Sequence, residues 1–267
     1  MSLKASRKVI QWSETGGYLA VSDQVARECP VALVYNGISF AVMMASPESL
    51  EEFAYGFSLS EGVIESLDDI FGIDVVPKDF ELVKGYSIDI EISARTAQRL
   101  SENRRALAGR TGCGICGIES IEKAVRPVKQ VKSVPSLNPK SIDRAVKTLD
   151  QYQVLQLETG GAHAAAWCDL EGEILKVFED VGRHNAMDKL LGYLASHRIS
   201  TRIGFVLMSS RGSYEIVQKA AALGVANLVT VSAPSALACE LASRSGINLV
   251  GFARPGREVI YTGSALE

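Results

Sequence analysis

The second half of the chain alternates short apolar runs with amphipathic segments, and this alternation restricts the possible folds more than any other feature. Apolar runs at 203–208, 228–231 and 247–251 have the length of buried strands, and helical periodicity fills 213–223 and 235–245 between them. A helix between two strands can carry the chain back across a sheet, so that the strands run parallel. The pattern therefore predicts an α/β fold with a largely parallel sheet and helices on both faces.

Other elements flank this core. A helix is predicted from Asn138-Pro139 to about Gln153, and a hairpin over 162–179 with its turn at Asp169–Gly172. A helix over 184–197 leads into the first apolar run, and Glu258–Thr262 is predicted as an edge strand.

The first third of the chain reads as a β-rich α+β unit. Asn36-Gly37 separates two apolar runs within 31–44, which is a strong hairpin signal because both residues tolerate positive φ. Ser46-Pro47 is predicted to open a helix, with Ser46 as its cap. Two strands are predicted within 71–93 with Pro77–Asp79 as their turn, and a polar helix follows over roughly 95–107.

Three regions follow from these patterns. Residues 1–108 form the predicted N-terminal domain, 109–137 a cysteine loop and a proline-containing linker, and 138–267 the predicted α/β domain.

The composition excludes several classes of protein. The net charge of −3 gives no global reason to expect nucleic-acid binding, and no apolar stretch is long enough for a membrane span. The N-terminus does not read as a signal peptide, so a cytoplasmic location is expected. Five scattered cysteines do not form a disulfide framework.

The carboxyl ends of the predicted parallel strands are rich in small and polar residues. Ligands of open α/β sheets bind at that edge. Free backbone N–H groups beside Arg211 in the segment 209–213 would suit a phosphate, and the segment 251–257 offers two arginines and an aromatic ring for a purine nucleotide. The segments 232–235 and 179–185 are further candidates, and the second contains His184.

Two cysteines share a glycine-rich segment, Thr111–Gly117, that leaves their thiols accessible. Cys113 and Cys116 could bind zinc, act as a redox dithiol, or carry sulfur as a persulfide. Zinc needs four ligands and no second pair is present, so no metal site is predicted. A thioredoxin-type pair normally opens a helix after the first strand of its fold, whereas this one lies between two domains. The spacing alone does not choose persulfide chemistry.

Several motifs together resemble the FdhD family, the sulfurtransferase accessory proteins of formate dehydrogenase. The resemblance rests on Gly109–Gly117 and Glu179–Lys189, and on the segments 209–213, 232–236 and 251–257 together with the early helix at 47–62. It implies a three-layer α/β/α sheet domain similar to cytidine deaminase, beside the smaller β-rich α+β N-terminal domain. A deaminase itself is disfavoured, because His163-Ala164-Ala165 has alanine where the essential glutamate would be.

The resemblance also implies a specific activity. Such proteins take persulfide sulfur from an IscS-type cysteine desulfurase and pass it to the molybdenum or tungsten bis(guanine dinucleotide) cofactor of formate dehydrogenase. Cys113 would carry the persulfide with help from Cys116, and a homodimer is expected. A chaperone that binds and delivers the cofactor without sulfur chemistry is the alternative. The expected cofactor-binding residues, from the motif and from the sheet edge, are Phe252, Ala253, Arg254, Pro255, Gly256, Arg257, Ser210, Arg211 and His184.

Overall fold

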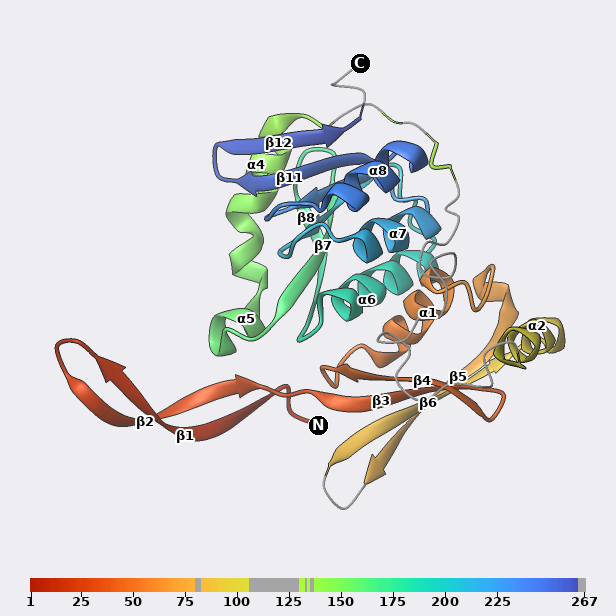
Figure 1. The fold of residues 1–267 in the computed structure, drawn as a ribbon, viewed down its shortest axis with the longest axis horizontal. Helices are drawn as coiled ribbons and strands as arrows, with labels where there is room; N and C mark the ends of the chain where they lie inside the picture. The colour runs from red at the N-terminus through yellow and green to blue at the C-terminus, as the bar shows by residue number, and fades with distance from the viewer. Residues whose placement is uncertain (80–82, 106–129, 133, 135–136, 264–267) are drawn as a thin grey trace.

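The computed structural model describes residues 1–79, 83–105, 130–132, 134 and 137–263. The strands of this part form a six-stranded sheet, a four-stranded sheet and a two-stranded ribbon (Figure 1). The fold is of the mixed α/β type, as the sequence predicts.

The six-stranded sheet has the order β12-β11-β10-β9-β7-β8. Its strands are β7 His163–Asp169, β8 Ile174–Asp180, β9 Gly204–Met208, β10 Asn227–Thr230, β11 Asn248–Arg254 and β12 Arg257–Thr262. Only β9, β10 and β11 run parallel. The prediction of a largely parallel sheet is therefore wrong at the flanks, because the tight hairpins β7–β8 and β11–β12 add antiparallel strands on either side.

Helices cover both faces of this sheet. One face packs on α6 Arg183–Ser196, α7 Tyr214–Ala222 and α8 Ala236–Ser245, and the other packs on α4 Pro139–Leu149. Successive side chains of a strand point to opposite faces of the sheet. In β7, Ala165 and Trp167 face the three helices, whereas Ala164 and Ala166 face α4. Asn138 caps α4, since its Oδ1 accepts from the Lys140 N–H at 3.0 Å. The likeness to cytidine deaminase stays a prediction.

The four-stranded sheet has the order β4-β3-β6-β5. Its strands are β3 Cys29–Tyr35, β4 Ile38–Ala45, β5 Ile70–Asp79 and β6 Lys84–Ile92, accompanied by α1 Leu50–Ser60, the 3₁₀ turn η1 Leu67–Asp69 and α2 Ala94–Arg105. The hairpin at Asn36-Gly37 is confirmed, with positive φ at both residues.

Two local predictions in this unit are wrong. Pro77–Asp79 continue β5 instead of forming its turn, and Pro77 fits there because β5 is an edge strand. Ser46 does not cap α1, which begins at Leu50 after Ser49. The Ser46 backbone N–H instead donates to the Asp180 carboxylate, and its hydroxyl accepts from the Val181 N–H.

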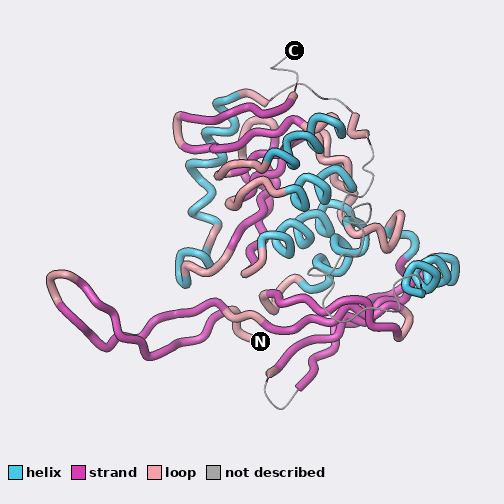
Figure 2. Tube along the Cα trace, in the orientation of Figure 1, coloured by secondary structure: helices cyan, strands magenta, loops and turns pink. Residues whose placement is uncertain are grey.

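The two-stranded ribbon was not predicted from the sequence. It pairs β1 Lys4–Ser13 with β2 Gly17–Ala26 and extends away from the other elements (Figure 2). The Gly16-Gly17 turn between two runs with branched and aromatic residues was an available signal.

Two glycines join the two larger sheet units. Helix α1 crosses α6 at Gly56 and Gly192, and the backbones approach so closely that there is no room for a side chain. A Cβ at Gly56 would overlap the carbonyl of Asp188, and a Cβ at Gly192 would overlap that of Glu52.

Buried ion pairs lie beside this crossing. The Lys189 ammonium is 2.6 Å from the Asp180 carboxylate and also donates to the carbonyl of Ser46. The Lys219 ammonium is 2.8 Å from the Asp188 carboxylate, which accepts from the Ser60 hydroxyl at 2.7 Å. Each network connects the C-terminal unit to the N-terminal one.

Because the two helix backbones touch at these glycines, Gly→Ala substitution there should destabilise the protein instead of stabilising it. Gly→Ala within a helix normally stabilises by about 1 kcal/mol. Gly192→Ala should instead lower the free energy of unfolding by about 1–3 kcal/mol, because the methyl group overlaps fixed backbone. Urea titration followed by Trp167 fluorescence measures the change, with Ser196→Ala on the exposed side of α6 as control. A stabilised Gly192→Ala variant would contradict the close packing.

The buried pair predicts a second, larger effect. Lys189→Met should lower the free energy of unfolding by about 3–5 kcal/mol, because it leaves the buried Asp180 carboxylate without its counterion. Lys84→Met breaks an exposed pair with Asp79 and should cost less than about 1 kcal/mol. Equal urea midpoints for the two variants would show that the buried pair does not hold the units together.

Candidate functional site

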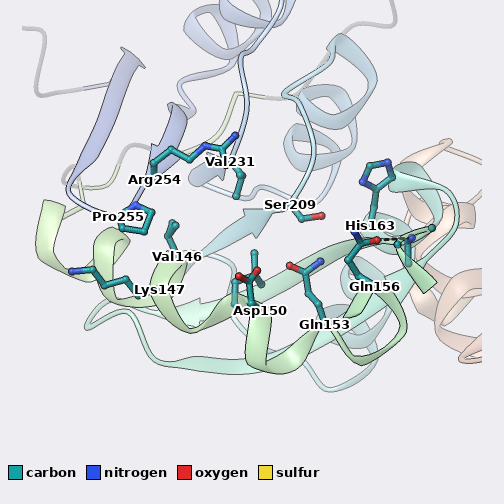
Figure 3. A pocket seen from close by; sticks show the side chains of 14 residues that line it. Val146, Lys147, Asp150, Gln153, Gln156, His163, Ser209, Val231, Arg254 and Pro255 are labelled. Atoms are coloured by element: carbon teal, nitrogen blue, oxygen red, sulfur yellow. Dashed lines mark hydrogen bonds between the residues drawn. The ribbon is translucent and has the colours of Figure 1, made fainter. Parts of the chain in front are cut away.

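A cavity of about 640 Å³ opens at the edge where β9, β10 and β11 end (Figure 3). Its size falls within the range of about 300–1,000 Å³ that is usual for small-molecule sites. The edge is the one that the sequence predicts for a ligand. The lining residues are Val146, Lys147, Leu149, Asp150, Gln153, Gln156, Gly160, Gly161, Ala162, His163, Ser209, Val231, Arg254 and Pro255.

The floor of the cavity is formed where helix α4 ends. The chain continues as a 3₁₀ turn, η2 Asp150–Tyr152, and a short helix, α5 Val154–Thr159. The Glu179 carboxylate replaces a cap at the start of α5, since it accepts from the N–H groups of Leu155 and Gln156 at 2.8 and 2.9 Å. The predicted helix to Gln153 therefore stops earlier, and its last residues turn toward the cavity.

Four of the polar side chains that line the cavity lack protein partners among the described residues. Within the described part of the chain, no hydrogen bond or ion pair is made by the side chains of Asp150, Gln153, His163 or Arg254. Gln153 is only 5% exposed. The few polar groups that line a cavity orient a bound ligand, so an unpaired amide that faces the cavity is available to a polar ligand.

His163 contributes a neutral group to one side of this cavity. Burial lowers the pKa of its imidazole, and the nearby Arg183 lowers it further. Ser209, the neighbouring lining residue, already has a protein partner, because its hydroxyl accepts from the Ala164 N–H at 2.8 Å.

The predicted loop at 251–257 is a hairpin that forms one rim of the cavity. Arg254 pairs with Arg257 across a turn made by Pro255 and Gly256, and Gly256 has φ 75°. The turn is fixed to α4, because the Asp143 carboxylate accepts from the Gly256 N–H at 2.7 Å and from Lys147 at 2.5 Å. These bonds lower the pKa of Asp143, the one to Lys147 contributing most.

Only part of the predicted cofactor-binding set lines this cavity. Of the six hairpin residues, Arg254 and Pro255 do so. Phe252 lies under the Arg257 guanidinium at 5.8 Å, and Ala253 is buried in the core against α4. The Ser210 hydroxyl donates to the carbonyl of Arg211, and neither residue is part of the lining.

His184 lies in a separate cluster where α6 and α7 begin. Its Nε2 is 3.9 Å from the Glu215 carboxylate and has no hydrogen-bond partner, as is true of the buried Arg183 Nε and Gln218 Nε2. Burial lowers the pKa of His184 to about 4, assisted by the positive charges of Arg183 and Lys219. The imidazole is therefore neutral at physiological pH.

The cysteine pair cannot be placed. Cys113 and Cys116 lie outside the described residues. Among the residues described, no group of three or more His, Cys, Asp or Glu side chains could hold a metal ion. No helix in the same part of the chain is long and apolar enough to cross a membrane.

Some lining residues were not predicted. Asp150, Gln153 and Gln156 were expected within or after a regular helix, with no ligand role. The cluster of polar residues that follows Leu149 was the available signal, but it reads equally well as a solvated helix end.

These features define an α/β protein with a cavity of small-molecule size at the carboxyl edge of its parallel strands. Residues 26–266 match the model of the FdhD/NarQ family, and the chain belongs to that family. The fold is also similar to the crystal structure of a protein from Desulfotalea psychrophila assigned as a formate dehydrogenase accessory protein. The TM-score is 0.77 at 24% sequence identity, and the match covers 99% of each chain.

The His184 cluster yields a prediction about protonation. In a pH titration followed by ¹³C NMR of the histidine Cε1 carbons, the His184 signal should remain that of a neutral ring at pH 6 and change only near pH 4. The chain has three histidines, so His184→Gln identifies the signal by its loss. A midpoint at or above 6.5 would contradict the buried position described for this ring.

Proposed function

We propose that this protein is a sulfur carrier, a sulfurtransferase with a persulfide intermediate. It takes sulfur from a cysteine desulfurase and transfers it to the molybdenum or tungsten bis(guanine dinucleotide) cofactor, enabling formate dehydrogenase activity. The observation that carries the proposal is the family match over residues 26–266. The fold shared with a protein assigned as a formate dehydrogenase accessory protein supports the same role in maturation.

Cys113 and Cys116 carry out the sulfur transfer in this proposal. The Cys113 thiolate attacks the outer sulfur of the donor persulfide, and the donor cysteine leaves as a thiolate. The Cys116 thiolate then attacks the inner sulfur of the Cys113 persulfide, a disulfide forms, and the outer sulfur leaves as hydrosulfide toward the cofactor. An external thiol reduces the disulfide and completes the cycle.

The cofactor is the acceptor, and the cavity at the sheet edge offers a place for one of its nucleotide arms. Arg254 supplies at the rim a guanidinium that pairs with no residue the structure describes, and it would bind an anionic phosphate. The proposal keeps the other predicted residues as expected cofactor contacts. Pro255 lines the cavity, and Phe252, Ala253, Gly256, Arg257, Ser210, Arg211 and His184 lie outside its lining. A homodimer would supply two such cavities for the two guanine nucleotides, and the reaction is placed in the cytoplasm.

A chaperone without sulfur chemistry is the second candidate. The cavity with its unpaired polar groups supports it equally, because binding and delivery of the cofactor need only this site. The two candidates differ in whether sulfur becomes covalently attached to Cys113.

A labelling experiment separates them. Incubation with a cysteine desulfurase and [³⁵S]cysteine should attach label that a thiol releases from the wild-type protein as hydrosulfide, since a persulfide loses its outer sulfur as hydrosulfide whereas a mixed disulfide would release cysteine. Cys113→Ala should reduce the label to background, and Cys116→Ala should retain it without releasing hydrosulfide. Cys239→Ala is the matched control, because Cys239 is a partly buried free thiol whose pKa is raised by burial.

The contrary outcomes are equally clear. An unlabelled wild-type protein that still activates formate dehydrogenase would favour the chaperone. Label that survives Cys113→Ala but is lost in Cys239→Ala would place the carrier on the wrong cysteine.

A further inference from the structure

The ribbon of β1 and β2 exposes large apolar side chains at its turn end. Ile10, Trp12, Tyr18 and Leu19 are 74%, 61%, 80% and 63% exposed. The register sets Trp12 opposite Tyr18 and Ile10 opposite Ala20, so three of these four side chains share one face of the ribbon. Exposed apolar side chains gathered in one place mark an interaction surface, whereas single ones need no explanation.

The turn end of this ribbon needs a partner to be stable in water. An isolated two-stranded hairpin is only marginally stable, and further strands or a packed surface are required to hold it. The base of the ribbon is fixed to α5, where the Lys4 ammonium lies 2.6 Å from the Glu158 carboxylate. The turn end extends away from the other elements (Figure 2). A partner that covers it would therefore stabilise the ribbon.

The four-stranded sheet of the same chain carries a second exposed apolar surface. Helix α1 packs on the face that contains Val31 and Leu33, so the alternate side chains of the sheet point to the opposite, outer face. On this outer face Val42 and Met44 of β4 are 59% and 47% exposed, and Ala32 of β3 lies opposite Val42. These residues of β4 and β3 form an apolar strip.

The charges next to the two apolar surfaces are opposite in sign. Asp89 lies between two core isoleucines of β6 and so points to the outer face, with Asp74 of β5 opposite it and Glu91 two residues further on. On the ribbon, Lys8 lies two residues from Ile10 and shares its face. Within the described chain, none of these four charged side chains forms an ion pair. The outer face is thus apolar beside acidic, and the ribbon face is apolar beside basic.

We propose that the ribbon of one copy packs across the outer face of the four-stranded sheet of a second copy. Within one copy the two surfaces cannot meet, because Arg27 and Glu28 alone separate β2 from β3 and the ribbon points away from the sheet (Figure 1). A twofold axis lets each copy give one ribbon and receive one. The aromatic turn end then lies on the apolar strip, and Lys8 faces the carboxylates.

The ribbon is long enough for this contact. Its ten-residue strands span about 33 Å at about 3.3 Å per residue, whereas four strands about 4.8 Å apart form a sheet roughly 15–20 Å wide. A covered aromatic side chain buries about 150–250 Å², so the four rings of two ribbons supply a large share of the roughly 1,200–2,000 Å² of a stable interface. The inference rests on the proposed function for the homodimer and adds the surface that forms it.

Photo-crosslinking tests the contact directly. Full-length protein labelled with ¹⁵N and carrying a benzophenone amino acid in place of Tyr18 is mixed with unlabelled wild type, with and without formate dehydrogenase. Cross-linked peptides should join the two isotopes, and the unlabelled peptide should come from the four-stranded sheet. The same amino acid in place of Ile203, which is 62% exposed, is the matched control and should give no cross-link to this sheet.

Sedimentation of paired variants tests the reciprocal exchange. Trp12→Ser with Tyr18→Ser alters the ribbon, and Val42→Lys alters the apolar strip, so each protein should show a dimer dissociation constant raised at least about tenfold. A mixture of the two should recover part of the affinity, because the Val42→Lys copy keeps a ribbon that fits the unaltered sheet of the other copy. Ile203→Ser should dimerise as wild type does. These positions lie outside the core clusters, so the urea midpoints should be unchanged.

Four outcomes would overturn the inference. These are a wild-type protein that is monomeric at micromolar concentration, a cross-link from position 18 only to another ribbon or to formate dehydrogenase, no recovery in the mixture, and equal weakening by Ile203→Ser. Each leaves the proposed sulfur transfer intact if Cys113 still accepts label from the desulfurase. Conversely, ribbon exchange with no label on Cys113 would support the interface and reject the sulfur transfer.

Discussion

The close crossing of α1 and α6 is the contact on which the arrangement of this protein depends. Gly56 and Gly192 let the two helix backbones meet without side chains between them. This brings Ser46 and Ser60 of the N-terminal unit within hydrogen-bonding distance of the buried groups at Asp180, Asp188 and their lysines. A buried charge is tolerated only with its partners in place, so the crossing and the ion pairs stabilise each other.

The same core positions the cavity on the far side of the junction. Asp180 ends β8, and Glu179 one residue earlier caps α5, so that adjacent residues of one strand hold the unit interface and the cavity floor. Burial raises the pKa of Glu179, while its two backbone donors favour the carboxylate that does the capping. Four polar side chains of the cavity, those of Asp150, Gln153, His163 and Arg254, make no hydrogen bond or ion pair within the described residues.

The sequence predicted the elements well where local rules determine them. Asn36-Gly37, Asn138-Pro139 and the turn after Asp169 act through backbone conformation and capping, which need no distant partner. Ser46 and Pro77 were misassigned because their roles are fixed by tertiary contacts: a carboxylate 134 residues away for Ser46, and an edge position in a sheet for Pro77. At the sheet edge predicted for a ligand the structure has a cavity, and Arg254, one of the predicted contacts, lines it. The sequence prediction did not include the lining residues Asp150 and Gln153, whose direction depends on how α4 ends.

The sequence by itself determined the class of fold and the family, because periodicity, turn residues and the motif segments are properties of the chain order. It also identified Cys113 and Cys116 as the candidate sulfur carriers, through residue type and the resemblance to the family. Only the tertiary structure decided which polar side chains share a cavity, since Asp150, His163 and Arg254 come from three separate elements. Their convergence depends on the strand order of the six-stranded sheet and on where α4 ends beside it, and neither is encoded in any local stretch of residues.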